Sequence, residues 1–178
     1  MIVIPTRLRD CYIIKPKLFS DNRGYFTESF NQAEFQKKTG HQGFFLQDNE
    51  SFSTYGVLRG LHGQAGENAQ AKLVRVVQGE VLDIAVDMRE DSPTYLQHHA
   101  EILNDVNKKQ LFIPRGFLHG FVVLSPTAIF HYKCDNFYHA ESEWGIRYDD
   151  PSLKIDWILP QAHLTISTKD RELPYLDI

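Results

Sequence analysis

The 178-residue sequence predicts a mainly β fold, an antiparallel sandwich or barrel with a few short helices. Three observations predict it. Short runs of β-branched and aromatic residues recur at regular spacing, Gly and Pro residues separate them, and aromatic residues make up 12% of the chain. No internal repeat, low-complexity tract or linker interrupts this pattern. We therefore expect one domain that spans residues 1–178.

One helix is expected, over residues 32–39. Asn31 is a suitable N-cap, and Glu34 follows three residues later, as in a capping box. Phenylalanines on either side of the cap occupy the positions of a hydrophobic staple. Gly40 is a typical C-terminal stop, because glycine readily adopts the left-handed conformation in which many helices end.

Strands are expected in most of the remaining chain. The most apolar pair, 72–78 and 80–87, is joined at Gly79. After Pro151 the pattern is less regular, and we expect helix or coil over 160–178. The predicted strands, in chain order, are 12–14, 24–30, 72–78, 80–87, 96–103, 110–113, 119–124 and 128–134.

Composition excludes several classes of function. The net charge is −4, so no broad basic surface indicates a nucleic-acid or membrane partner. The first ten residues carry Arg7, Arg9 and Asp10, and no apolar run is long enough to span a bilayer. Cys11 and Cys134 lie in no C-x-x-C motif, which favours two reduced thiols. We expect a cytoplasmic protein.

Residues 56–64 hold a candidate general base. A neutral imidazole accepts a proton near pH 7, and His62 lies close to Arg59 in this segment. The alternative is a half-buried structural histidine. Strict strand alternation would place Arg59 and His62 on opposite faces, unless Gly60 forms a bulge that brings them to one face.

In two further predicted strands, a polar residue shares one face with apolar residues that would face the interior. Lys72 alternates with Val74 and Val76, so it is either a buried cation or a lysine at the strand end with its head in water. Tyr132 alternates with Phe130 and Cys134. It is either a core tyrosine or a proton donor inside a cavity.

The pattern of ligands argues against a metal. A transition-metal site in a barrel of this kind needs several histidines and a carboxylate. After His62 the sequence continues Gly63-Gln64, and Gln70-Ala71-Lys72 stands where a glutamate ligand would be expected. Because an ammonium group repels a cation, we predict no metal.

Taken in order, these segments resemble the RmlC-type dTDP-4-dehydrorhamnose 3,5-epimerase family of the cupin superfamily. The resemblance covers about residues 12–176, and its clearest departure is Gly63, where the family usually has an aromatic residue. It implies a cupin-type double-stranded β-helix, or jelly-roll barrel. The segments that carry it are Asp21–Glu28, Gln47–Asn49, Leu58–His62, Ala71–Val76, Gly79–Val81, Pro114–Gly120, Tyr132–Cys134, Gly145–Pro151 and Ser167–Asp170.

The resemblance also implies roles for individual residues. His62 would remove protons next to the C4 ketone of a dTDP-4-keto-6-deoxyhexose, and Asp170 would hold its other nitrogen. Lys72 would stabilise the enolate oxygen, and Tyr132 would return a proton from the opposite face. This chemistry needs no redox cofactor, so the resemblance implies that the protein has no cofactor. The residues implied to bind the substrate are Arg23, Phe26, Glu28, Gln47, Asn49, Arg59 and Tyr138 for the nucleotide and His119 for the sugar.

The family forms homodimers by sheet exchange, which implies that Arg23, Phe26 and Glu28 enter the site of a second subunit. Four other functions stay open at this point. They are a mono-epimerase that inverts C3 or C5 alone, a sugar ketoisomerase, a non-catalytic carbohydrate-binding cupin and a metal-dependent oxygenase. Counting the positions that take up deuterium from heavy water separates the first of these from a double epimerase.

Overall fold

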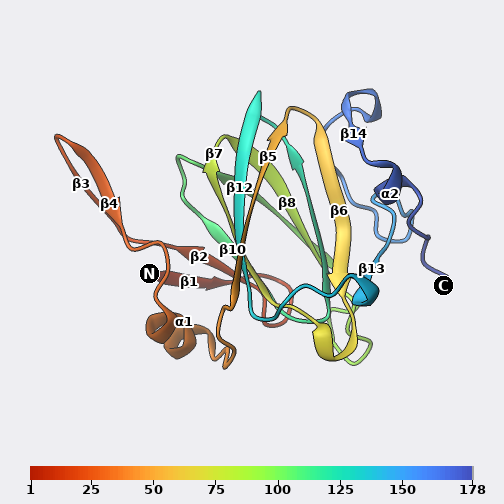
Figure 1. Ribbon diagram of the computed structural model, residues 1–178, viewed down its shortest axis with the longest axis horizontal. Coiled ribbons are helices and arrows are strands. Elements are labelled where there is room, and N and C mark those ends of the chain that lie inside the picture. Colours follow the sequence, from red (N-terminus) through yellow and green to blue (C-terminus); the bar gives the residue numbers. More distant parts are fainter. Residues whose placement is uncertain (178) are drawn as a thin grey trace.

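The computed structural model describes residues 1–177, whose strands form two facing sheets and a separate hairpin (Figure 1). Apart from β14, which pairs in parallel with β6, the described strands pair antiparallel. The first sheet has the order β1 (Ile2–Pro5), β2 (Tyr12–Lys15), β10 (Gln110–Ile113), β7 (Lys72–Gln78), β12 (Thr127–Cys134) and β5 (Gln47–Thr54). The second has the order β13 (Glu143–Gly145), β6 (Val57–Gln64), β11 (Phe117–Val123), β8 (Glu80–Asp87) and β9 (His98–Asn104), with β14 (Thr165–Ile166) beside β6. The predicted mainly β fold is confirmed.

The main core lies between the two sheets. Val74 of β7 and Phe130 of β12 pack there against Val81 and Ala85 of β8, and all four are buried. A second cluster covers the outer face of the second sheet, where Trp157 and other residues of the C-terminal part pack. Because this layer covers the outside of β6, polar residues of β6 that alternate with its leucines face inward.

The helix α1 (Gln32–Thr39) has the predicted bounds. The Asn31 side chain accepts a hydrogen bond from the Glu34 backbone N–H at 3.1 Å, and Gly40 ends the helix with φ of 76°. Phe35 is fully buried, and its ring lies 5.8 Å from that of Phe30. The predicted caps and the predicted staple are therefore present, and Phe35 packs against Leu73 and Phe112 of the first sheet.

The hairpin of β3 (Leu18–Asp21) and β4 (Gly24–Thr27) extends away from both sheets (Figure 1). The predicted strand 24–30 is wrong beyond Thr27, because the chain leaves its only partner strand there and turns into the N-cap of α1. Most side chains of the hairpin are exposed.

The other predicted strands agree with the structure in most of their length. β7, β8 and β10 have the predicted bounds, and β2, β9, β11 and β12 differ by one or two residues at their ends. β7 and β8, joined at Gly79, belong to different sheets rather than pairing with each other. The predicted strands did not include β1, β3, β5, β6, β13 or β14, although strand alternation was considered for Arg59 and His62 of β6.

Short helices occupy the connections and the C-terminal part. They are η1 (Gly66–Asn68), η2 (Ala140–Ser142), η3 (Gln161–His163) and α2 (Thr168–Arg171). The segment predicted as helix or coil, 160–178, contains η3, β14 and α2, and residue 178 lies outside the described part. Across residues 1–177, no helix has both the length and the apolar character that a membrane crossing requires.

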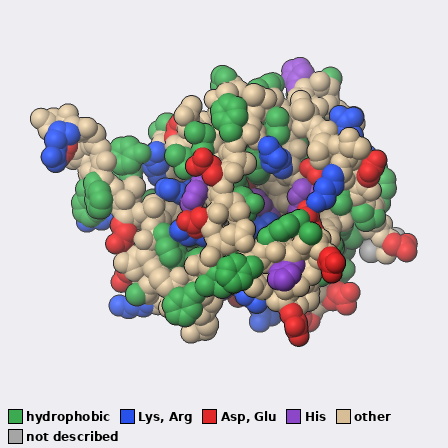
Figure 2. Space-filling view, in the orientation of Figure 1, with side chains coloured by type: hydrophobic (Ala, Val, Ile, Leu, Met, Phe, Trp, Pro, Cys, Tyr) green, Lys and Arg blue, Asp and Glu red, His purple; other side chains and the backbone are tan. Residues whose placement is uncertain are grey.

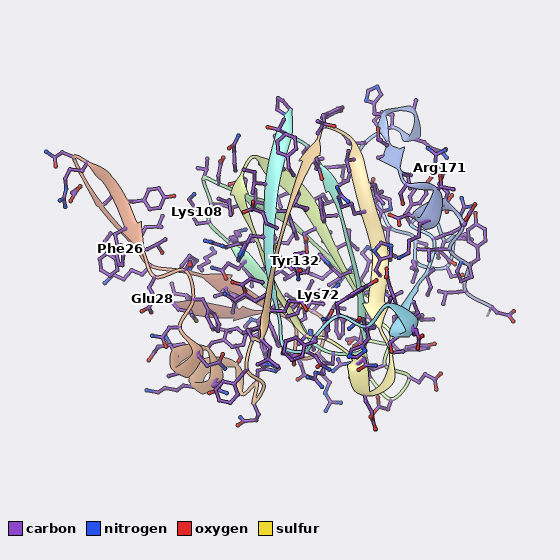
Figure 3. All side chains as sticks on the ribbon, in the orientation of Figure 1. Phe26, Glu28, Lys72, Lys108, Tyr132 and Arg171 are labelled. Carbon is purple, nitrogen blue, oxygen red and sulfur yellow. The ribbon has the colours of Figure 1, made fainter. Side chains whose placement is uncertain are left out.

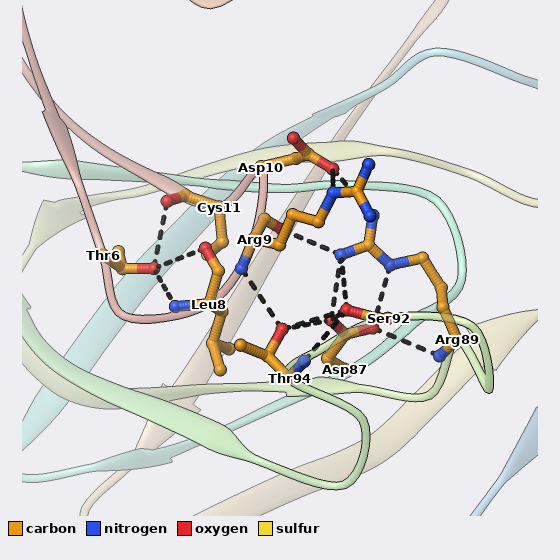
Figure 4. A network of polar contacts seen from close by, with 9 residues as sticks. All are labelled: Thr6, Leu8, Arg9, Asp10, Cys11, Asp87, Arg89, Ser92 and Thr94. Atoms are coloured by element: carbon orange, nitrogen blue, oxygen red, sulfur yellow. Dashed lines mark hydrogen bonds and ion pairs between the residues drawn. The ribbon is translucent and has the colours of Figure 1, made fainter.

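A polar network centred on Asp87 ties the N-terminal segment to the connection after β8 (Figure 4). The Asp87 side chain is fully buried and accepts hydrogen bonds from Arg89, Ser92 and Thr94. Arg89 also pairs with Asp10 at 2.9 Å. Burial raises the pKa of Asp87, but these hydrogen bonds outweigh it and bring the pKa to about 2.

We expect Asp87→Asn to lower the free energy of unfolding by about 3 kcal/mol, because it removes the partner of Arg89 inside this network. Urea denaturation measures the loss, with the exposed Asp91→Asn as control. Since the pKa is lower in the folded state, wild-type stability from this group is present above about pH 4 and is lost as the pH falls toward 2. A variant that unfolds like the Asp91 control contradicts this account.

Candidate active site

A cavity of about 570 Å³ opens between the two sheets, and a second lobe of about 310 Å³ adjoins it. Figure 2 shows a hollow on this face, with basic and histidine side chains at its edge. Three of the predicted residues line both lobes: His62, Lys72 and Tyr132. Of the other predicted residues, Arg59, His119 and Asp170 line the first lobe and Gln47, Asn49 and Tyr138 line the second.

A bulge in β6 explains why Arg59 and His62 reach the same cavity. His62 lies opposite His119 of β11, and Arg59 lies opposite Phe121, so β6 has one more residue than β11 between these pairs. Gly60 sits at this point with φ of 118°, a conformation that favours glycine. The expected bulge at Gly60 is confirmed.

His62, which is partly buried, and the buried Asp170 form a pair between β6 and α2. The Nε2 atom of His62 lies 2.9 Å from Oδ1 of Asp170, and the backbone N–H of Gly60 donates to Oδ2 at 3.2 Å. Burial raises the pKa of Asp170, but the hydrogen bond from His62 and other contacts outweigh it, so the pKa is lowered. A carboxylate at Nε2 leaves Nδ1 of His62 as the nitrogen that can accept a proton.

Lys72 is the first residue of β7. Its ammonium nitrogen lies 5.9 Å from the centroid of the Tyr132 ring. Within residues 1–177, none of the ion pairs around the cavity includes Lys72. Burial lowers the pKa of Lys72, because desolvation disfavours the charged form. Of the two interpretations from the sequence, the inward cation agrees with the structure.

Tyr132 lies on the inner face of β12 with Phe130 and Cys134, as its alternation predicts. Figure 3 shows Tyr132 and Lys72 between the two sheets. Burial raises the pKa of Tyr132, so the phenol keeps its proton at neutral pH. A protonated phenol can donate a proton to a ligand in the cavity.

The second lobe is polar. Gln47 and Asn49 of β5 are joined by a hydrogen bond of 3.0 Å, and the Tyr138 backbone N–H donates to Gln47 at 3.1 Å. At the rim, the Tyr138 hydroxyl donates to Glu143 at 2.7 Å, and Glu143 pairs with Lys169 at 2.8 Å. Amides and an exposed aromatic ring suit a nucleoside better than an apolar ligand.

Arg23, Phe26 and Glu28 lie outside this cavity. Figure 3 shows Phe26 and Glu28 at the hairpin and its base, far from Lys72. Phe26 is 69% exposed, and Arg23 pairs with Asp21 of the same hairpin. These residues do not join the site formed by their own chain.

The polar residues at the site that the sequence did not predict include Asp83, Glu143 and Lys169. Asp83 could have been predicted from the sequence, because it lies on the same face of β8 as the buried Val81 and Ala85. Its carboxylate lies 2.9 Å from Nε2 of His119. A charged residue on the inner face of an apolar strand indicates a polar site.

The described residues, 1–177, contain no group of three His, Cys, Asp or Glu side chains arranged to hold a metal ion. The absence of a cofactor stays a prediction from the sequence.

Gly63 lines the second lobe but not the first. A Cβ atom there would lie 2.8 Å from the Phe117 carbonyl oxygen and 3.4 Å from Nε1 of Trp144. Trp144 lies opposite Gly63 in β13. The position where the family has an aromatic residue is therefore closely packed between neighbouring strands.

The fold and the site together define a cupin-type isomerase that works by acid–base chemistry. The family model for dTDP-4-dehydrorhamnose 3,5-epimerase matches residues 5–177, and the chain belongs to this family. The enzyme of that name from Salmonella typhimurium is 50% identical, over 99% of this chain and 96% of its own length.

Two solved structures are closely similar. The dTDP-4-dehydrorhamnose 3,5-epimerase from Elizabethkingia anophelis has a TM-score of 0.96 and 52% identity, over 98% of this chain and 96% of its own. The epimerase from Legionella pneumophila, in complex with dTDP-4-keto-L-rhamnose, has a TM-score of 0.95 and 47% identity, over 99% and 93%. The predicted cupin-type jelly roll is confirmed.

Proposed function

We propose that this chain catalyses the epimerisation of dTDP-4-keto-6-deoxy-D-glucose at C3 and C5, which gives dTDP-4-keto-L-rhamnose. One observation carries the proposal: His62, Lys72 and Tyr132 line one cavity, as a base, a cation and an acid. Family membership and the sugar nucleotide bound by the Legionella pneumophila enzyme support the choice of substrate.

The chemistry follows from the C4 ketone. A ketone acidifies the hydrogens on the adjacent carbons, because the resulting carbanion spreads onto oxygen as an enolate. Nδ1 of His62 removes the proton, with Nε2 held by Asp170. The ammonium of Lys72 stabilises the enolate oxygen, and the Tyr132 hydroxyl protonates the carbon from the opposite face. No electrons are transferred to or from the sugar.

Incubation with dTDP-4-keto-6-deoxyglucose in heavy water tests this function. We expect the product to carry deuterium at C3 and C5, with both centres inverted by NMR. Deuterium at one carbon alone supports the mono-epimerase instead. A 3-keto product supports the ketoisomerase, and an unchanged, unlabelled sugar supports a binding protein, so each of these outcomes overturns the proposal.

We also propose a cytoplasmic homodimer in which the hairpin of each chain completes the nucleotide site of the other. The exposed ring of Phe26 and the extension of β3 and β4 beyond the sheets support this arrangement. The buried Cys11 and Cys134, which form no disulfide, agree with a reducing compartment.

Mixing two inactive variants tests the shared site. One carries His62→Ala, and the other carries Arg23→Ala with Glu28→Ala. In a mixed dimer, one site receives an intact base and an intact hairpin. After unfolding and refolding together, we expect the mixture to recover about a quarter of wild-type activity, as random pairing of two subunits gives. No recovery, with the dimer intact by light scattering, contradicts the shared site.

A further inference from the structure

A second histidine–carboxylate pair lies at the first lobe of the cavity, which His62, Lys72 and Tyr132 also line. His119 of β11 lies directly opposite His62 of β6 and lines the first lobe. Its Nε2 atom lies 2.9 Å from Oδ2 of Asp83, whose side chain is completely buried. The cavity therefore has two histidines in neighbouring strands, each with its own carboxylate.

The Asp83 carboxylate has one hydrogen-bond partner. Its other oxygen, Oδ1, is buried and makes no hydrogen bond within residues 1–177. A buried carboxylate is costly without hydrogen bonds, so the contact with His119 is the one that offsets its burial. A carboxylate accepts and cannot donate, which requires the proton of His119 to be on Nε2.

The other nitrogen of His119 is then an acceptor. Burial lowers the pKa of His119, and the nearby Lys72 lowers it further, against the opposite effect of Asp83. A neutral ring with a proton on Nε2 has a lone pair on Nδ1. Nδ1 makes no hydrogen bond to residues 1–177 and is not among their fully buried unpartnered atoms, so it remains open to the cavity.

We infer that Asp83 is a positioning residue that fixes His119 in the Nε2–H tautomer, so that Nδ1 accepts a hydrogen bond from a hydroxyl of the sugar. This inference rests on the proposed function. In a 4-keto-6-deoxyhexose linked through C1, the free ring hydroxyls are those at C2 and C3. His119 thus recognises a hydroxyl as a neutral acceptor, while Lys72 supplies positive charge to the ketone oxygen.

Nitrogen NMR of histidine-labelled wild-type protein reads the tautomer directly. We expect the His119 ring to show a protonated Nε2 and an unprotonated Nδ1 at neutral pH. A proton on Nδ1, or on both nitrogens, overturns the inference. This measurement needs neither a variant nor turnover, so its result is independent of the proposed function.

Asp83→Asn tests the link to substrate binding. The amide can donate to Nε2, which would move the His119 proton to Nδ1 and replace the acceptor by a donor. We expect kcat/KM to fall about 10- to 100-fold, mainly through a higher KM, because the hydroxyl is bound in both the ground state and the transition state. An unchanged tautomer, or a KM within twofold of wild type, overturns the inference.

Asp87→Asn is the matched control, because it removes a buried carboxylate of the same strand, one that lines neither lobe and bonds to Arg89, Ser92 and Thr94 in the polar network of Figure 4. It should lower stability and leave both KM and the His119 tautomer unchanged. A wild type that does not epimerise the sugar refutes the proposed function, whereas an active wild type with the wrong tautomer refutes this inference alone.

Discussion

His62→Ala is expected to lower kcat for epimerisation by about 10²- to 10⁴-fold, the usual size of a general-base contribution. The pair with Asp170 at 2.9 Å holds the imidazole so that Nδ1 faces the cavity, and alanine leaves no group there that can remove a proton. Deuterium uptake from heavy water should disappear with turnover, because no enolate forms. Proton NMR of the sugar follows both signals in one experiment.

His98→Asn is a suitable control for this variant. His98 lies on β9, at the edge of the second sheet, and lines neither lobe of the cavity. It should retain wild-type kcat and deuterium uptake. If His62→Ala still exchanges deuterium at C3 and C5 at the wild-type rate, the base is another residue and the proposed mechanism fails.

Lys72→Met is expected to lower kcat/KM by about 10²- to 10³-fold, because methionine keeps most of the side-chain length and removes the charge over the enolate oxygen. Burial lowers the pKa of Lys72 from its ordinary 10.5. The ammonium is present below this lowered pKa and is lost above it. The wild-type kcat/KM profile should therefore decline with rising pH before 10.5, and the decline due to Lys72 should be absent from the variant.

Lys15→Met provides the comparison, since Lys15 is exposed at the end of β2 in the same sheet. Its activity and pH profile should equal those of wild type. A loss below tenfold for Lys72→Met, or an alkaline decline that survives the substitution, would show that another group stabilises the enolate.

The parts of the fold that the sequence predicted well have strong local signals. The helix α1 is set by its N-cap Asn31 and its stop Gly40, and both act within a few residues. β7 and β8 are apolar on the face that meets the core, so their bounds are clear. Their assignment to different sheets depends on long-range pairing, which a hydrophobic pattern does not encode.

The strand β5 was not predicted because its residues serve the site. Apart from Phe52, all of Gln47–Thr54 are polar or charged. One face presents Gln47 and Asn49 to the cavity, and the other face is exposed, so the apolar alternation that marks a strand is missing. The polar residues that serve the site are thus the reason why the strand could not be predicted from a hydrophobic pattern.

Among the site residues, His62, Lys72 and Tyr132 could be assigned to one site from strand alternation together with the family resemblance. Asp83 was within reach of the same reasoning, as a charged residue on the inner face of β8. Arg23, Phe26 and Glu28 came from the resemblance alone. Their distance from the cavity follows from the short, exposed pairing of β3 with β4, for which the sequence has no apolar pattern.

The bulge in β6 makes the active site depend on the number of residues in a strand. Leu58 and Leu61 face the outer cluster, while Arg59 and His62 face the cavity. The extra residue at the bulge therefore changes which alternate residues of β6 face inward. Deleting that residue would restore an ideal strand and turn the imidazole toward the outer layer. A regular strand at this position could not present both Arg59 and His62 to the cavity, so the irregular strand is a requirement of the active site.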